Sequence, residues 1–231
     1  NVLDFENPAR YPTAPPAEVR RHLGIAPNDI LILQPTRVVP RKGIEHAISI
    51  VAKLKNPRCK LVVSHESGDE GHEYMAAIEE HAADSGVDLR FVHTHLRRNA
   101  TGESAANGTV VESKYSLWDV YPCADLVTYT SLYEGFGNAF LESVFFKKPL
   151  IVNRYSIWIE DIEPKGFQAL TMDGYVTGDL IERVNRVLGN EKLRKRMVDH
   201  NFDLGSRHYS YSVLLRSLNT LITNITGLQK I

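Results

Sequence analysis

Residues 125–153 have the sequence DLVTYTSLYEGFGNAFLESVFFKKPLIVN, and they decide the fold of the chain. Two apolar runs, 125–130 and 149–153, are typical of buried strands. Between them lie a glycine turn, EGFG at 134–137, and an apolar segment that favours a helix. Glycine lets a backbone approach a ligand closely, and the first N–H groups of a helix are available to an anion. The stretch therefore predicts a strand–turn–helix–strand unit that binds a ligand at its turn.

The same alternation of strands and helices continues on both sides of this unit. Four more apolar runs are typical of strands that are covered on both faces; they are 29–35, 60–64, 88–93 and 167–171. Helical patterns separate the runs, as in residues 44–51, where apolar residues recur at i, i+3, i+4 and i+7. The alternation predicts an α/β fold, a doubly wound, mostly parallel six-stranded Rossmann-like sheet with right-handed crossovers.

The remaining segments have a different character. Residues 1–16 contain four prolines and little periodicity, so we expect a linker or lead-in, followed by a single domain over 17–231. Residues 99–108 are rich in Gly, Ala, Asn, Ser and Thr and predict a long inserted loop. Three successive helical patterns predict a helical C-terminal tail; they cover 177–190, 191–210 and 211–225.

The composition is that of an ordinary globular domain. Of 231 residues, 43% are hydrophobic and 24% are charged, and the net charge of -1 gives no reason to expect nucleic acid as a partner. No apolar run approaches the roughly 20 residues that span a bilayer, and the first residues do not have the pattern of a signal peptide. Two cysteines fit buried, reduced thiols. We therefore expect a cytoplasmic location, with peripheral membrane attachment through another domain left open.

A basic loop follows the first predicted strand. Arg37, Arg41, Lys42 and Gly43 lie between that strand and the next helix. Ligands of open parallel sheets bind at the carboxyl ends of strands, and cations there suit a phosphate. A solvated charged loop explains this stretch equally well.

Histidines and acids gather in two other segments. The first segment, HESGDEGH at 65–72, is glycine-rich and favours a solvated turn over a metal site, because metal ligands must converge at fixed spacing. We therefore expect no metal. His93 and His95 end a predicted strand on the ligand side, so a binding role stays open for them. No Ser or Cys stands in a glycine elbow, which argues against a nucleophile of that kind.

The motif from Glu134 to Glu142, EGFGNAFLE, followed by KPLIV at 148–152, resembles the nucleotide-sugar motif of retaining GT-B glycosyltransferases. The similarity is to glycosyltransferase family 4, the glycosyl transferases group 1. Arg37 with Lys42-Gly43, YPCAD at 121–125 and NVLDF at 1–5 support it, so the resemblance covers essentially the whole chain. It implies one half of a GT-B fold, the C-terminal donor-binding domain, without the N-terminal acceptor domain.

The resemblance also implies a role for each motif residue. Arg37 and Lys42 would neutralise the donor diphosphate, so that neither a metal nor another cofactor is expected. Glu142 would bind the ribose hydroxyls. Glu134, the candidate catalytic residue, would hold the hexose together with nearby N–H groups, and the backbone near Val92 and His93 would meet the base. The implied donor site comprises Arg37, Lys42, Gly43, Val92, His93, Glu134, Gly135, Phe136, Gly137, Asn138 and Glu142.

The implied activity is transfer of a hexose from a nucleotide sugar, such as a UDP-, GDP- or ADP-hexose, with retained configuration to an unknown acceptor. The isolated chain would be inactive without its N-terminal domain. Two alternatives stay open: a GT-B-type nucleotide-sugar epimerase and a non-catalytic nucleotide-binding module. The chain departs from the family pattern at 64–65, where Ser-His replaces the usual glycine, and at 153–156, where NRYS stands near the usual Gly-Gly pair.

Overall fold

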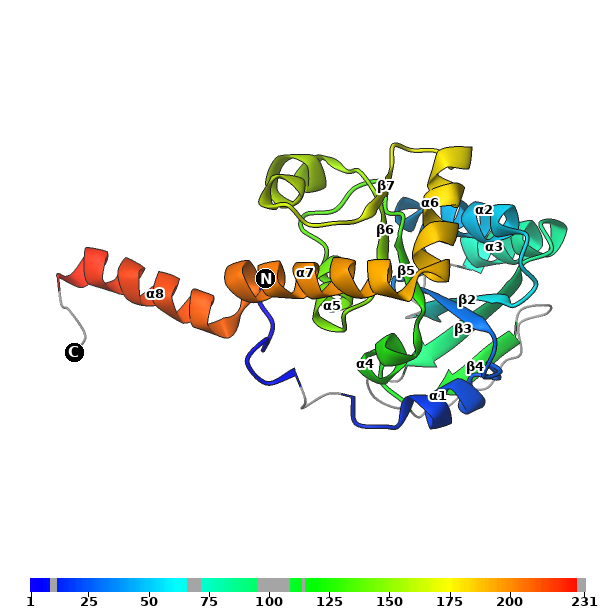
Figure 1. The fold of residues 1–231 in the computed structure, drawn as a ribbon, viewed down its shortest axis with the longest axis horizontal. Coiled ribbons are helices and arrows are strands. Elements are labelled where there is room, and N and C mark those ends of the chain that lie inside the picture. Colours follow the sequence, from blue (N-terminus) through cyan, green and yellow to red (C-terminus); the bar gives the residue numbers. More distant parts are fainter. Residues whose placement is uncertain (9–11, 66–71, 95–108, 114, 228–231) are drawn as a thin grey trace.

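The computed structural model describes residues 1–8, 12–65, 72–94, 109–113 and 115–227. Its centre is a seven-stranded sheet in the order β4-β3-β2-β1-β5-β6-β7 (Figure 1), and every neighbouring pair is parallel. The strands are β1 (Ile30–Gln34), β2 (Cys59–His65), β3 (Asp88–Thr94), β4 (Thr109–Ser113), β5 (Leu126–Tyr129), β6 (Leu150–Asn153) and β7 (Leu170–Met172).

The predicted α/β class and all six predicted strands are confirmed. β4 was not predicted, and it pairs with β3 at the edge of the sheet. Its sequence, TVVES, has only two adjacent apolar residues, so it lacks the pattern of a strand covered on both faces. The predictions for residues 99–108 and for His95 lie outside the described residues.

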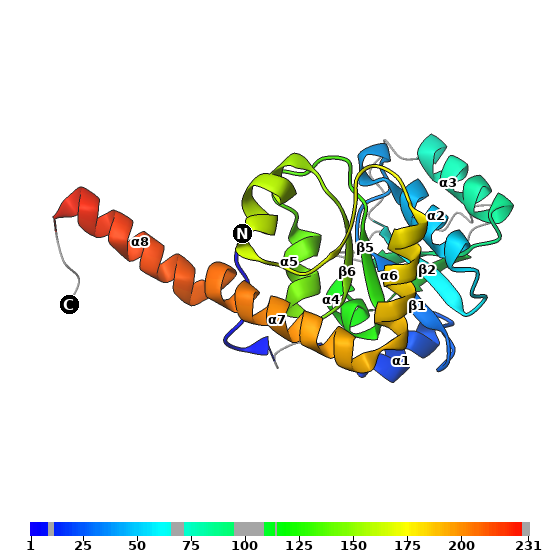
Figure 2. The ribbon, with the colours of Figure 1, turned by 45° about the horizontal axis from the view of Figure 1, so that its top comes forward.

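Helices cover both faces of the sheet (Figure 2), which makes the fold doubly wound. On one face lie α1 (Pro16–His22), α4 (Leu117–Val120) and α5 (Asn138–Phe145), and on the other lie α2 (Ile44–Leu54), α3 (His72–Asp84) and α6 (Gly178–Gly189). The helix α7 (Glu191–Tyr209) contributes to both cores. Short helical turns connect these elements at η2 (Pro40–Lys42), η3 (Tyr121–Cys123), η4 (Trp158–Ile162) and η5 (Glu163–Lys165).

The central strand shows why the sequence folds this way. Successive side chains of a strand point to opposite faces, so an unbroken apolar run can fill two cores at once. In β1, Leu31 and Leu33 belong to the core with α5, whereas Ile32 belongs to the core with α2, and all three are wholly buried. The sheet is therefore covered by helices on both faces. A ligand can reach it at the carboxyl ends of the strands, where open parallel sheets bind their ligands.

The lead-in is attached to the domain at two places. Leu3 N–H donates to the Tyr209 carbonyl at 2.9 Å, and Phe5 is only 4% exposed. A Cβ added at Gly205 of α7 would lie 2.7 Å from the Phe5 ring, so glycine is what admits this ring. Farther along, the Thr13 N–H donates to Asp119 Oδ1 at 2.7 Å. The described part of the lead-in thus packs on the sheet domain.

The last helix, α8 (Tyr211–Thr226), extends away from the body of the molecule (Figures 1 and 2). None of its residues is buried, and its large apolar side chains are exposed. Four of them recur at helical spacing and form an apolar stripe, which consists of Leu214, Leu218, Leu221 and Ile225. Within the described part of the chain, no helix is long and apolar enough to cross a membrane.

Candidate functional site

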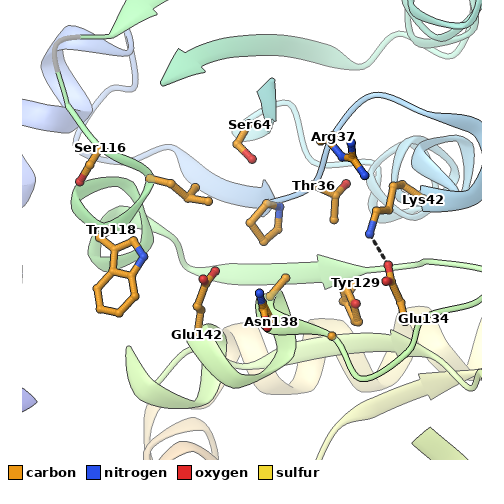
Figure 3. Close-up of a pocket in the computed structure, with 14 residues that line it drawn as sticks. Thr36, Arg37, Lys42, Ser64, Ser116, Trp118, Tyr129, Glu134, Asn138 and Glu142 are labelled. Atoms are coloured by element: carbon orange, nitrogen blue, oxygen red, sulfur yellow. Dashed lines mark hydrogen bonds and ion pairs between the residues drawn. The ribbon is translucent and has the colours of Figure 1, made fainter. Parts of the chain in front are cut away.

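A pocket of about 650 Å³ opens beyond the carboxyl ends of β1, β2 and β5. β1 lies between β2 and β5, so the connections from β1 and β5 diverge at this point. Ligands of open parallel sheets bind at such switch points. The pocket (Figure 3) is lined by Pro35, Thr36, Arg37, Lys42, Ser64, Ser116, Leu117, Trp118, Tyr129, Glu134, Gly137, Asn138, Ala139 and Glu142.

The structure brings six of the predicted residues together in this pocket: Arg37, Lys42, Glu134, Gly137, Asn138 and Glu142. The other predicted site residues that the structure describes are not among those that line the pocket. Val92 is 1% exposed and belongs to the core, and Phe136 packs its ring against Phe140 and Tyr209. The backbone of His93 pairs in register with His65 of β2. The predicted roles of these residues remain predictions.

The basic loop is fixed to β5 by buried polar groups. The Gln34 side chain is wholly buried and donates from Nε2 to the Lys42 carbonyl at 3.2 Å, while its Oε1 accepts from Thr128 at 2.6 Å. Thr130 Oγ1 donates to the Gly43 carbonyl at 2.8 Å. Buried polar groups that are fully paired define one conformation, because leaving any of them unpaired is costly. The loop therefore presents Arg37 and Lys42 from a rigid base.

Gly43 is the N-cap of α2 and has φ of 60°, and a Cβ there would overlap the carbonyl oxygen of Thr130. We expect Gly43→Ala to lower the free energy of unfolding by about 2 kcal/mol or more, since both the left-handed backbone and the overlap are unfavourable. The matched control is Gly135→Ala, because no atom lies within 4 Å of a Cβ at Gly135 and the change should stay within about 0.5 kcal/mol. Urea unfolding of both variants tests this, and equal losses would contradict it.

Side chains at the ends of β5 and β6 and just after β6 contact the glycine turn and the residues before it. Gly137 has φ of 107°, and a Cβ there would lie 2.6 Å from the Tyr129 hydroxyl oxygen. The Tyr155 hydroxyl donates to the Phe136 carbonyl at 2.6 Å, and Asn153 Nδ2 donates to the Ser131 carbonyl at 3.1 Å. Asn153 and Tyr155 lie in the NRYS segment, where this chain departs from the family pattern. Tyr155 therefore supports the glycine turn directly, and Asn153 supports the segment just before it.

Lys42 and Glu134 form an ion pair inside the pocket (Figure 3), and both side chains are 11% exposed. Burial lowers the pKa of Lys42, although the hydrogen bond and charge of Glu134 oppose this shift. Burial alone would raise the pKa of Glu134, but the hydrogen bonds of Lys42 and Ser131 and the charges of Lys42 and Arg41 together outweigh burial, and the pKa lies below its ordinary value. Arg41 adds a second contact to Glu134, at 3.3 Å. Glu134 is therefore ionised at neutral pH.

Glu142 lies on the pocket side of α5 and accepts a hydrogen bond from the Tyr121 hydroxyl at 2.8 Å. Tyr121 is wholly buried. Burial raises the pKa of Glu142, and the Tyr121 hydrogen bond offsets part of this shift. One carboxylate oxygen is thus fixed by the protein, which orients the group toward the pocket.

Several lining residues were missed in the sequence. Ser64 lies near the carboxyl end of β2, so the same strand-end argument that selected Arg37 would have found it. Trp118 lies on a four-residue helix, which is too short to show a periodic pattern. Tyr129 ends β5, and its place in an apolar run indicates only a buried strand. Within the described residues, no group of His, Cys, Asp or Glu could hold a metal ion.

Residues 105–202 match the sequence model of the family Glycosyl transferases group 1. The matched range includes both Glu134 and Glu142. This match agrees with the resemblance of the motif to the same family.

The chain is 30% identical over 242 residues to mannosylglucosylglycerate synthase of Thermotoga maritima, and the match covers 91% of this chain and 52% of that protein. The chain thus spans about half the length of the curated relatives it matches. A further relative, alpha-D-kanosaminyltransferase of Streptomyces kanamyceticus, is 26% identical over 201 residues, and the match covers 85% of this chain and 46% of that protein.

Solved structures share the fold. The Anabaena protein Alr3699/HepE, crystallised in complex with UDP and glucose, has a TM-score of 0.76 at 16% identity, covering 97% of this chain and 56% of that one. The C-terminal domain of the glycosyl transferase group 1 family protein LpcC from Francisella tularensis has a TM-score of 0.66 at 19% identity, covering 90% of this chain and 99% of that one. The architecture is therefore that found in glycosyltransferases of the GT-B fold.

Proposed function

We propose that the chain is the donor-binding half of a retaining glycosyltransferase of family 4 and that its pocket binds a nucleotide-diphosphate hexose. The observation that carries the proposal is the order of charges along the pocket (Figure 3). Glu142 lies in the middle, and Arg37 and Lys42 lie toward one end. A carboxylate suits the hydroxyls of ribose, and cations suit a diphosphate. A nucleotide sugar carries its ribose and its diphosphate in the same order.

In this proposal, two cationic side chains and one helix N-terminus bind the diphosphate. The Arg37 side chain is exposed and forms no hydrogen bond or ion pair with the described part of the chain, so it is available to a ligand. Lys42 supplies a second cation. The helix α5 begins at Asn138 beside the pocket, and its first N–H groups add the positive end of the helix dipole. Together they provide the charge that a metal ion would otherwise supply.

Glu134 binds the hexose beyond the diphosphate. Its ionised carboxylate accepts hydrogen bonds from sugar hydroxyls, while its partner Lys42 contacts the phosphate. The bond that breaks joins the anomeric carbon to a phosphate oxygen, and the departing diphosphate gains negative charge. Fixed cations at that oxygen stabilise the transition state without rearrangement. This arrangement supports transfer with retention, in which the leaving group and the incoming acceptor share one face of the sugar.

The pocket accounts for a donor but not for an acceptor. On this proposal the acceptor binds to a second domain, in keeping with relatives that are about twice as long as this chain. The apolar stripe of α8 has the exposure and spacing to pack against such a domain. The isolated chain then binds a nucleotide sugar and does not sustain transfer.

A thermal-shift screen of the chain with UDP, GDP, ADP and their hexose conjugates tests the proposal. A ligand that binds the folded state raises the melting temperature by mass action. We expect at least one nucleotide diphosphate to do so and the matching nucleoside to have a much smaller effect. No shift with any of them would overturn the proposal and favour a non-catalytic module that does not bind nucleotides. Conversion of a nucleotide sugar to its epimer, with no acceptor present, would favour an epimerase.

A further inference from the structure

We infer that Trp118 is the platform on which the base of the bound nucleotide stacks. The inference rests on the proposed function, because it names the part of the same pocket that takes the base. It assigns to Trp118 a role in donor affinity that is separate from the charges at the other end of the pocket.

The position of Trp118 follows from the order of groups in the pocket (Figure 3). Ser116 and Trp118 line one end, Glu142 lies next to them, and Lys42 lies toward the opposite end. With ribose at Glu142 and phosphate toward Lys42, the base must continue in the other direction, toward Trp118. An aromatic ring at that end offers a flat apolar surface to a base.

The Trp118 indole packs against a set of aromatic rings, and the last of these rings, Tyr121, is hydrogen-bonded to Glu142. Trp118 contacts Phe145 and Phe146 with ring centroids 5.5 and 5.3 Å apart. Phe146 stacks on Tyr121, with centroids 5.1 Å apart and ring planes at 12°. The hydroxyl of Tyr121 then donates to Glu142 at 2.8 Å. The platform and the carboxylate are thus positioned by one continuous set of packed rings, which fixes the spacing between base and ribose.

The short helix that carries Trp118 is anchored at its start. A four-residue helix is not stable alone, so tertiary contacts must hold it. Ser116 caps the helix, and its hydroxyl donates to Asp119 Oδ2 at 2.7 Å. The other oxygen of Asp119 accepts from the Thr13 N–H and hydroxyl, at 2.7 and 2.8 Å. These bonds hold the segment 116–119 in place before any ligand binds.

Stacking predicts a specific pattern of affinities. Every base has a flat π face, so stacking does not depend strongly on which base is present. Replacement of Trp118 should therefore weaken UDP, GDP and ADP alike. Inorganic pyrophosphate has no base, so its affinity should not change. A merely structural role of Trp118 would affect pyrophosphate as well.

The binding experiment uses the full chain and the variants Trp118→Ala and Trp118→Phe in calorimetric titrations. The probes are UDP, GDP, ADP and inorganic pyrophosphate. We expect Trp118→Ala to weaken each nucleotide that the parent binds by about tenfold or more, with pyrophosphate affinity unchanged. Trp118→Phe should retain most of the nucleotide affinity, since it keeps an aromatic face. Unliganded melting curves establish that both variants are folded.

Intrinsic fluorescence gives an independent measurement, because the chain has only two tryptophans. Trp158 is 1% exposed and packs against Phe140 in the core, so it should not respond to a ligand. Titration with a nucleotide should change the emission of the parent and of Trp158→Phe. Trp118→Phe should show no change, although it still binds.

Each outcome separates the inference from the proposed function. If the parent binds a nucleotide diphosphate and Trp118→Ala binds it equally well, the base lies elsewhere and only the inference is wrong. If Trp118→Ala loses pyrophosphate and nucleotide to the same extent, Trp118 is structural and the inference is also wrong. If the parent binds neither kind of ligand, the proposed function fails and the inference fails with it.

Discussion

Glu142→Gln is expected to weaken nucleotide-diphosphate binding by about 100-fold and to leave the unliganded chain at least as stable as the parent. The glutamine removes the charge and one of the two acceptor oxygens that ribose hydroxyls require, and charge-assisted hydrogen bonds are the stronger ones. It keeps one oxygen for the Tyr121 hydroxyl, so that buried donor stays paired. Isothermal titration with UDP, GDP and ADP measures the affinity, and urea unfolding measures the stability.

The expected stability follows from the pKa of Glu142. Burial raises this pKa in the folded state, so the folded chain binds the proton more tightly than the unfolded chain does. Stability therefore falls as pH rises from the unfolded pKa to the folded one, and the loss is complete above the folded pKa. Glutamine resembles the protonated carboxyl and does not undergo this loss. Affinity for the nucleotide should show the opposite trend in the parent and decrease as pH falls through the raised pKa.

The control for this experiment is Glu182→Gln on the exposed side of α6, which should change neither affinity nor stability. A large fall in the unliganded stability of Glu142→Gln would mean that Glu142 has a structural role. Unchanged nucleotide affinity would remove Glu142 from the donor site. A pH profile of affinity that is the same in parent and variant would contradict its titration in the pocket.

The second large effect is expected at Lys42. Lys42→Met should abolish detectable pyrophosphate binding. It should also lower the free energy of unfolding by about 3 kcal/mol, because it leaves the Glu134 carboxylate buried with only Arg41 as a cationic partner. Arg37→Met is the matched variant. Arg37 is exposed and unpaired within the described residues, so its loss should weaken pyrophosphate and leave stability within about 0.5 kcal/mol.

The double variant Lys42→Met with Glu134→Gln isolates the ion pair. Removing both charges should recover much of the stability that Lys42→Met loses, since no buried charge remains alone. Urea unfolding and titration with inorganic pyrophosphate measure the two effects separately. Normal pyrophosphate binding by Lys42→Met would move the phosphate site away from this loop. Full stability of Lys42→Met would mean that the ion pair makes no net contribution.

Local patterns were enough to predict most of the fold. The apolar runs and helical periodicities depend on neighbouring residues only, and they identified six strands and the three C-terminal helices. The motif at 134–142 and the basic loop also predicted which strand ends would meet. β4 was not predicted, because a strand at the edge of a sheet needs no long apolar run. The lead-in was expected as a linker from its prolines, whereas Phe5 packs against Gly205 of α7.

The contacts that complete the site join residues far apart in the chain. Tyr121 donates to Glu142, Asn153 supports the carbonyl of Ser131, and Trp118 reaches the pocket from a helix without periodicity. None of these contacts has a local signature in the sequence, because each depends on how separate elements pack. The sequence therefore predicted the charged groups of the site better than the side chains that position them.

The junction of β1 and β5 has a consequence for the rates of folding and unfolding. In this junction Ile32 lies opposite Leu126 and Leu33 lies opposite Val127, so it joins segments that are more than 90 residues apart. Pairings at such separation form slowly, because a long loop must close before they contribute. The pocket spans this junction, with Lys42 on one side and Glu134 and Glu142 on the other. A ligand that contacts both sides should therefore slow the unfolding of the chain, because the two sides must separate for the chain to unfold.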